Sequence, residues 1–168
     1  MYKRQEQGHA SAQNNLGIVY KNGHGVDVNY KKAIEWYKKA AEQGHVLAQY
    51  NLGVTYSGGK DVDVNYKKAF EWYEKAAEQG HADALYNLGL MYEYGVVVDQ
   101  SDSMAMRWYA KAAAQGFEQA QARISIILAR RRASTPAAEA PSPASGNQER
   151  EKKEKKKKAS ASKKKRNG

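Results

Sequence analysis

The feature that most constrains this chain is a repeat of 36 residues that recurs without a single insertion. Residues 8–43 and 44–79 are identical at 25 of 36 positions, which chance does not produce. A fixed period of this length indicates stacked supersecondary units, each burying its apolar face against its neighbours. The period is marked by glycines at Gly8, Gly44, Gly80 and Gly116. It predicts three full repeats, residues 8–43, 44–79 and 80–115, flanked by two half repeats.

Each unit contains two helical patterns. In the first unit, Ala12, Leu16 and Tyr20 fall on one face of a helix over about residues 10–21. The second pattern, over about residues 30–43, aligns Ala33, the Trp36-Tyr37 pair and Ala40. Residues suited to helix N-caps precede the second pattern in every unit, namely Asn29, Asn65 and Ser101. The glycine after each second pattern suits a left-handed helix end, at Gly44, Gly80 and Gly116.

A glycine lies in the middle of each first helix, at Gly17, Gly53 and Gly89. Such a residue costs ~1 kcal/mol relative to alanine in a helix interior. We expect the compensating gain to be a close approach of the second helix, whose Trp and Tyr rings fill the space. The Trp-Tyr pairs are therefore interpreted as core and not as an aromatic ligand cage. The loops between the two helices share a first glycine but differ in the residues that follow it. The first unit has Gly23-His24-Gly25 and the third has Gly95-Val96-Val97.

These motifs resemble the Sel-1-like repeat family, a relative of the tetratricopeptide repeat. The shared residues are the L-G-x-x-Y of the first helix, the G-x-x-V loop and the A-x-x-W-Y-x-x-A-A of the second. The resemblance covers nearly all of residues 1–129 and nothing after them. It implies an all-α fold, an α/α superhelix or solenoid of tandem 36-residue helix-turn-helix repeats, and a non-enzymatic adaptor function. Members of the family act in endoplasmic-reticulum-associated degradation, in chitin synthase activation and in bacterial signalling.

Charge divides the chain in two. Residues 1–129 contain 14 basic and 14 acidic side chains, whereas residues 130–168 contain 14 basic and 4 acidic ones. The second segment has almost no apolar side chains with which to bury surface. The sequence therefore predicts a repeat domain over 1–129 and a disordered Lys-rich tail over 130–168, with Arg130–Arg132 either extending the last helix or beginning the tail.

Three interpretations of the tail stay open. It is a passive solvated segment, or an electrostatic contact for nucleic acid or an anionic lipid surface. No interleaved aromatic residue supports sequence-specific reading of nucleic acid. The third interpretation is a nuclear-import signal formed by Lys155, Lys156, Lys157, Lys158, Lys163, Lys164, Lys165 and Arg166.

Composition also limits the cellular setting. The chain contains no Cys, so it has neither disulfides nor thiolate metal ligands. It differs in this from the cysteine-rich secreted bacterial members of the family. No leader-like apolar stretch opens the sequence and no run is long enough to span a membrane. We expect a cytoplasmic protein, nuclear through the tail and not secreted. The opening half repeat is consistent with a natural start or with a fragment of a longer product.

No residue pattern predicts catalysis, a cofactor or a metal. A histidine recurs once per unit at the turn into the first helix, at His9, His45 and His81. Stacked repeats set such residues side by side instead of converging, so we interpret them as structural turn residues and not as metal ligands. The glycines around His24 lack the remaining features of a phosphate-binding loop. No Ser, His and Asp combination has the context of a nucleophilic site.

Positions that vary between units indicate where a partner binds. In the first helix they occupy one arc of the helix surface, apart from the core positions. We call this set the variable stripe and predict that it lines a concave groove for a protein or peptide. Tyr50 and Tyr86 are the predicted anchors, unless they pack on neighbouring units instead. The stripe comprises Ser11, Asn14, Ile18 and Lys21, then Leu47, Tyr50, Val54 and Ser57, then Asp83, Tyr86, Leu90 and Glu93.

Overall fold

The computed structural model of the chain describes residues 2–58 and 62–134, with side chains from Gly8 onward. The described residues form seven α-helices and no strand, as the sequence predicts. Residues 135–168 of the tail predicted over 130–168, which include the nuclear-import candidate, lie outside them. The helices are α1 (Tyr2–Asn22), α2 (Tyr30–Glu42), α3 (Val46–Gly58), α4 (Tyr66–Glu78), α5 (Ala82–Tyr94), α6 (Asp102–Ala113) and α7 (Glu118–Ser134).

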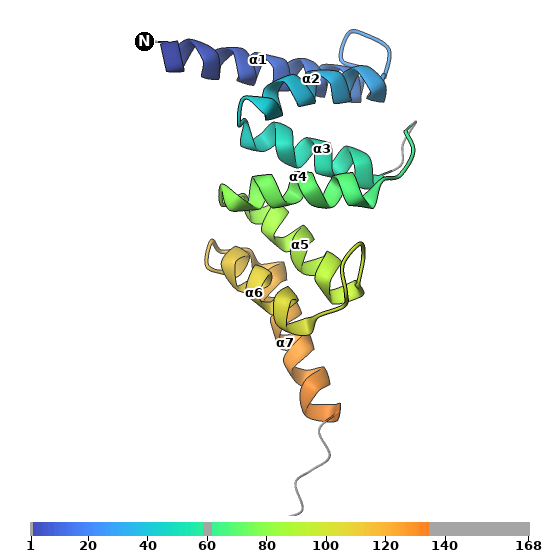
Figure 1. The fold of residues 1–168 in the computed structure, drawn as a ribbon, viewed down its shortest axis with the longest axis vertical. Coiled ribbons are helices and arrows are strands. Elements are labelled where there is room, and N and C mark those ends of the chain that lie inside the picture. Colours follow the sequence, from blue (N-terminus) through green and yellow to red (C-terminus); the bar gives the residue numbers. More distant parts are fainter. Residues whose placement is uncertain (1, 59–61, 135–168) are drawn as a thin grey trace, which may run out of the picture. The chain divides into compact units, whose positions relative to one another are not determined.

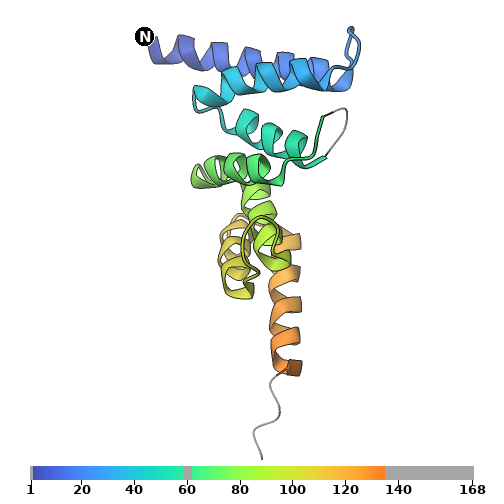
Figure 2. The same cartoon turned by 45° about the vertical axis from the view of Figure 1, so that its right-hand side comes forward.

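The helices pack as hairpins that follow one another in chain order. Helices α1 and α2, α3 and α4, and α5 and α6 form the three pairs, while α2 contacts α3 and α4 contacts α5 (Figure 1). The same order is visible after rotation (Figure 2). All three pairs belong to one compact unit that ends at Arg130, within α7. Arg130–Arg132 are therefore helical, since α7 continues to Ser134.

The predicted helix ends are confirmed. The Asn29 and Asn65 side chains each accept a hydrogen bond at 2.9 Å from the backbone N–H three residues later. Ser101 accepts the corresponding bond at 3.2 Å. The left-handed glycines Gly44, Gly80 and Gly116 have φ values of 83°, 84° and 83°. These capping bonds satisfy donors that the helix itself leaves unpaired.

The glycine inside each first helix accommodates a tyrosine ring. A Cβ atom added to Gly53 would lie 2.4 Å from Cε1 of Tyr73, and the contacts of Gly17 with Tyr37 and of Gly89 with Tyr109 are as close. Tyr37 and Tyr109 are fully buried and Tyr73 is almost so. The expected close approach of the second helix is confirmed, and the Tyr of each Trp-Tyr pair produces it.

The prediction that the tryptophans are core residues holds only in part, because Trp72 and Trp108 pack against the core without being fully buried. Trp36, Trp72 and Trp108 are only half-buried. The ammonium group of the lysine three residues later covers each ring, at 4.2 Å from the ring centroid for Lys75 over Trp72. Adjacent residues on a helix point about 100° apart, so only one of the pair faces the first helix. The tyrosine of each pair is therefore the buried residue, and the tryptophan is partly exposed beside it.

The first helix differs from its counterparts in α3 and α5. Leu16 is 39% exposed, whereas Leu52 and Leu88 are fully buried. Helices α2 and α4 contact α3 and α5 respectively, and no described helix precedes α1. Leu16 and Ala12, on the apolar face that the sequence predicts for this helix, are therefore both exposed. The turn expected at Gly8 is also absent, because α1 continues through it.

The loop of the third repeat keeps the backbone of the first despite its different residues. Gly23 and Gly25 have φ values of 74° and 75°, and their counterparts Gly95 and Val97 have 69° and 71°. A β-branched residue at positive φ is strained, since its side chain collides with the backbone. The stacking of the helices thus overrides the local preference of Val97. The corresponding loop of the second repeat, residues 59–61, lies outside the described residues.

Candidate protein-binding surface

In α1, the variable stripe contains both accessible and enclosed residues. Ser11 is exposed, and its Oγ lies 3.3 Å from Nε2 of His45 at the start of α3. Asn14 is 3% exposed and accepts a hydrogen bond of 3.1 Å from the Asn51 amide. Ile18 and Lys21 are half-buried. Asn14 is thus part of the floor between α1 and α3 and not an exposed contact residue.

In α3, the stripe contains one exposed apolar side chain and one tyrosine whose ring packs on the next repeat. Leu47 is 52% exposed and Val54 is half-buried. The Tyr50 ring stacks on the His81 ring at 4.5 Å and lies 6.0 Å from Tyr73, measured between ring centroids. Burial raises the pKa of Tyr50, the Asp83 charge adds to this rise, and a hydrogen bond with Asn87 opposes it.

In α5, the corresponding tyrosine makes equivalent contacts. The Tyr86 ring centroid is 5.5 Å from that of Tyr109 and 5.1 Å from that of Phe117. Asp83 and Leu90 are half-buried. Both stripe tyrosines therefore contact the neighbouring repeat with one part of the ring, which is the alternative that the sequence left open. Their role in binding stays a prediction.

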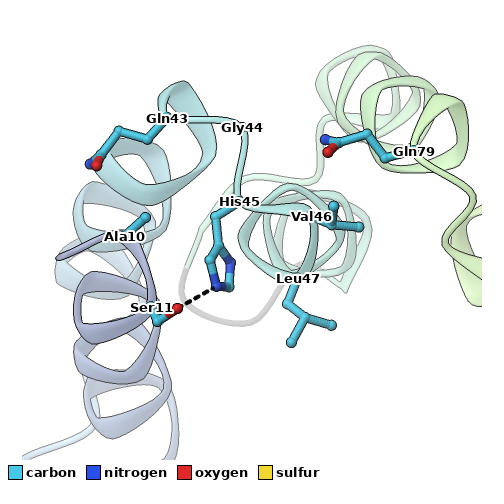
Figure 3. A pocket seen from close by; sticks show the side chains of 8 residues that line it. All are labelled: Ala10, Ser11, Gln43, Gly44, His45, Val46, Leu47 and Gln79. Atoms are coloured by element: carbon cyan, nitrogen blue, oxygen red, sulfur yellow. Dashed lines mark hydrogen bonds between the residues drawn. The ribbon is translucent and has the colours of Figure 1, made fainter. Parts of the chain in front are cut away.

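Two pockets adjoin the stripe at the two ends of α3. The α3-start pocket has a volume of about 440 Å³, and Figure 3 shows the Ser11 and His45 side chains meeting at one side of it, with Leu47 nearby. It is lined by Ala10, Ser11, Gln43, Gly44, His45, Val46, Leu47 and Gln79. The α3-end pocket has a volume of about 190 Å³ and is lined by Lys21, Tyr30, Val54, Thr55 and Gly58.

The contact between Ser11 and His45 is structural in character. His45 Nδ1 accepts a hydrogen bond of 3.2 Å from the Ala48 backbone N–H, so the proton of the neutral ring is on Nε2. The ring then donates to Ser11 and has no free lone pair with which to accept the hydroxyl proton. Burial lowers the pKa of His45, which favours this neutral form. His45 thus caps α3, as His81 caps α5.

The predicted turn role is confirmed for His45 and His81, whereas His9 lies inside α1 and accepts from the Gln13 side chain. Within residues 2–58 and 62–134, no group of three or more His, Asp or Glu side chains is placed to hold a metal ion. No helix in this part of the chain combines the length and apolar character that a membrane span requires.

The three buried tyrosines differ in their polar partners. The residue four positions after each mid-helix glycine is Lys21, Ser57 or Glu93. Tyr73 Oη lies 3.1 Å from Ser57 Oγ, and Tyr109 Oη donates to Glu93 Oε2 at 2.7 Å. Tyr37 Oη is buried and has no hydrogen-bond partner among the described residues. Burial raises the pKa of Tyr37 to about 12.

Glu93 is the centre of a polar cluster that sequence reasoning missed. Its side chain is 2% exposed, and one carboxylate oxygen lies 3.0 Å from both Nε and Nη2 of Arg123 in α7. Arg130 adds a contact at 3.9 Å and pairs with Asp102 at 2.6 Å. A buried carboxylate requires such partners. The sequence contained a signal for this cluster. Glu93 and Arg123 bring opposite charges to positions where the residues 36 places earlier, Ser57 and Asn87, are neutral.

These features define an α-helical repeat protein, built from two-helix units that each place a tyrosine ring on a glycine. The Sel1 repeat matches residues 10–45, 46–81 and 82–117. The chain belongs to the Sel1 repeat family, in agreement with the resemblance of its motifs. The Sel1 repeat is typically a non-enzymatic scaffold fold, and proteins built from it are generally protein-interaction scaffolds.

Solved structures support this assignment. The chain is 41% identical to a Sel1 repeat protein from Oxalobacter formigenes, with a TM-score of 0.67, over 71% of this chain and 48% of that one. It is 39% identical to c5321, a protective antigen of uropathogenic Escherichia coli with an SLR fold, with a TM-score of 0.68, over 70% and 25% of the two chains. The chain thus spans half or less of these relatives.

A more distant structure shows the fold alone. Helicobacter pylori cysteine rich protein B is 22% identical to the chain, with a TM-score of 0.56, over 73% of this chain and 96% of that one. No curated protein matches the chain.

Proposed function

We propose that the chain is a scaffold that binds a protein segment along the variable stripe, across α1 and α3. The observation that carries this proposal is that both pockets at the ends of α3 are lined by stripe residues. Leu47 borders one pocket and is 52% exposed, although helix stacking requires no apolar residue there. A large apolar side chain beside a concave surface is a common anchor at interfaces.

The residues that we propose for the partner contact are the accessible members of the stripe. Ser11, Ile18 and Leu47 belong to this set, whereas Asn14 is buried and bonded to Asn51. Tyr50 and Tyr86 retain the anchor role assigned to them, with part of each ring supporting the next repeat. Because of those ring contacts, truncation of either tyrosine is expected to lower stability as well as binding, so neither is the best test.

Leu47→Lys is the better test, since the side chain is exposed and the change leaves the core intact. The probe is a phage-displayed library of random 12-residue peptides, selected on the full chain. Binding of the selected peptides is expected to fall at least tenfold, because interface anchors contribute about 2 kcal/mol or more. Ile126→Lys is the matched control, being 50% exposed on α7 and outside the stripe. Selected peptides that bind the Leu47→Lys variant unchanged would contradict the proposal.

The charge of the tail supports a second candidate function. Residues 130–168 carry the whole net charge of +10, which suits contact with nucleic acid or an anionic surface, or nuclear import through the lysine clusters from Lys155 to Arg166. Binding of a 20-base-pair DNA duplex by the full chain should then weaken steeply with salt. It should vanish when residues 135–168 are deleted. Retention of DNA binding by the truncated chain would contradict this assignment.

A further inference from the structure

The loops that follow the first helices bring exposed apolar side chains to one edge of the first two repeats. In both views the loop after α1 and residues 62–65 after α3 lie on the same side (Figure 1 and Figure 2). The α3-end pocket also shows that these ends are adjacent, since Tyr30 and Gly58 both line it. We call this region the loop edge. Its apolar side chains are 41–52% exposed, namely Val26, Val28, Val64 and Tyr66.

The backbone ties both loops to their helices in the same way. The Asn29 N–H donates a hydrogen bond of 2.8 Å to the Tyr20 carbonyl. The Asn65 N–H donates one of 2.8 Å to the Tyr56 carbonyl. Each loop therefore returns to the end of its own first helix and presents its apolar residues to solvent. Apolar side chains gathered on a surface in this way mark an interaction site.

Four exposed lysines flank these apolar side chains, in the first turns of α2 and α4. They are Lys31, Lys32, Lys67 and Lys68. None of them forms an ion pair with a described residue, and neither first turn contains an acidic residue. Positive charge in a first turn opposes the helix dipole. The fold therefore does not account for this placement of charge.

The third repeat shows that the solenoid does not require these lysines. At the register positions of Lys67 and Lys68 it has Ser103 and Met104. The third loop is also apolar, since Tyr94 is 61% exposed and Val97 is 49% exposed. The positive charge thus belongs to the first two repeats. There, over residues 23–32 and 62–68, the four lysines outnumber the two aspartates of the loops and leave a net charge of +2.

Protruding apolar side chains flanked by lysines match the chemistry of a bilayer surface that contains anionic lipid. A tyrosine ring suits the headgroup level of a membrane. Lysine stems lie along apolar surface while their ammonium groups reach lipid phosphates. The anchor residue of a protein partner fills a pocket instead. Neither the α3-start pocket nor the α3-end pocket is lined by any of the four apolar side chains.

We propose that the loop edge docks the chain on an anionic membrane surface. The four apolar side chains enter the headgroup region and the four lysines contact lipid phosphates. The contact is peripheral, as for other protein surfaces that combine apolar and basic side chains. It is independent of the proposed function, because no loop-edge residue belongs to the variable stripe. It is also separate from the tail, since every residue involved lies in the first two repeats.

The absence of Cys allows insertion to be measured at single sites of the full chain. Val64→Cys, labelled with a nitrobenzoxadiazole fluorophore, reports from the loop edge. Leu47→Cys reports from the other end of α3, where the native side chain is 52% exposed against 49% for Val64. The probe is vesicles of phosphatidylcholine and phosphatidylserine at four to one. Emission from position 64 is expected to shift to the blue and rise several-fold, whereas emission from position 47 should not change.

Vesicles of phosphatidylcholine alone should change neither emission. A chain that sediments with the anionic vesicles while position 64 stays unchanged would be held by its tail alone, which overturns the proposal. Equal changes at both positions, or no sedimentation of the chain, would overturn it as well. A label at position 64 that responds to a peptide from the 12-residue library, but not to vesicles, would assign the loop edge to a protein partner and contradict the membrane contact.

Removal of two lysines tests the charge. Attraction to an anionic surface strengthens binding about fivefold per lysine. Lys31→Gln with Lys67→Gln should therefore raise the lipid concentration for half of the response at position 64 about tenfold or more. Lys39→Gln with Lys75→Gln is the matched control, because it removes the same charge from the last turns of the same helices. It should leave that concentration nearly unchanged. Equal losses in the two double variants would mean that only total charge matters, which overturns the proposal.

Discussion

The first and third repeats share a core but differ in the polar groups around it. In both, a second-helix tyrosine lies on a first-helix glycine, Tyr37 on Gly17 and Tyr109 on Gly89. The hydroxyl of Tyr109 donates to the buried Glu93, which Arg123 of α7 also contacts. The hydroxyl of Tyr37 is buried and has no hydrogen-bond partner among the described residues.

This difference shows that the repeat determines the packing of the tyrosine on the glycine but not the polar partner of the tyrosine hydroxyl. The glycine and the tyrosine recur every 36 residues, whereas the residue one turn after the glycine changes from Lys21 to Ser57 to Glu93. In the third repeat that residue attaches α7 to α5. In the first it is left at the edge of a pocket. The same register position thus joins two helices in the third repeat and borders a pocket in the first.

Helix α7 extends the comparison. Ser125 stands at the register position of Gly53 and Gly89. A Cβ atom at those glycines would lie within 2.5 Å of a tyrosine ring, so α7 lacks the feature that accepts a second helix. Instead it buries Ala120 and Ile127 and presents Arg123 to Glu93. The third repeat is therefore completed by a helix of different character.

The largest expected effect separates the two aromatic residues of each second helix. Tyr73→Ala should lower the free energy of unfolding by roughly 3–5 kcal/mol, as truncation of a buried large side chain does. Trp72→Ala should cost clearly less, about 1–2 kcal/mol, because the ring is half-buried. Urea denaturation of the full chain measures both. An equal loss of unfolding free energy in the two variants would mean that Trp72 contributes to the core as much as Tyr73 does.

Much of this packing was predictable, and the part that was not has a physical reason. The register and the cap residues located the helices within a few residues, and the glycines indicated a close helix approach. The choice between Trp72 and Tyr73 was not predictable, because both lie near the inward face of one helix. Only the way in which the helices cross decides which ring meets Gly53. Leu16 followed the repeat pattern, but its burial depends on a neighbouring helix.

The candidate site was predictable only in outline. Variation between units located the stripe, since positions that the core fixes do not change. The buried Asn14 is paired with Asn51, a residue 37 positions later, and no local pattern shows that pairing. The cluster around Glu93 depends on Arg123, 30 positions later. Such pairings arise from stacking, and residue spacing alone does not specify them.

A smaller loss is expected when the mid-helix glycine is filled. Gly53→Ala places a Cβ atom 2.4 Å from the Tyr73 ring, and overpacking of this kind costs about 1–3 kcal/mol. Gly8→Ala is the control, because it lies inside α1 with nothing within 4 Å of the added atom. It should raise stability by up to ~1 kcal/mol through helix propensity alone. A stabilising Gly53→Ala change, measured by the same denaturation, would show that the close contact is not required.

The smallest effect concerns the strained loop of the third repeat. Val97→Gly should raise the free energy of unfolding by about 1 kcal/mol, because the change removes the strain of a β-branched residue at positive φ. Val64 has the same exposed fraction of 49% without positive φ. Its replacement by glycine should therefore lower stability, by roughly 0.5–1 kcal/mol. Thermal unfolding of both variants checks the opposite signs, and a loss at both positions would mean that Val97 carries no strain.

The central claim is that the three buried tyrosines share one packing role but differ in their polar partners, and the most direct measurement is the Tyr→Phe series. Each substitution keeps the ring and removes only the hydroxyl. Tyr109→Phe should cost about 1.5–3 kcal/mol, because it removes a hydrogen bond to a buried charge, and Tyr73→Phe about 1 kcal/mol. Tyr37→Phe should leave the free energy of unfolding unchanged or slightly higher, since its hydroxyl has no described partner. Equal losses at all three positions, or a loss at Tyr37 as large as that at Tyr109, would contradict the account.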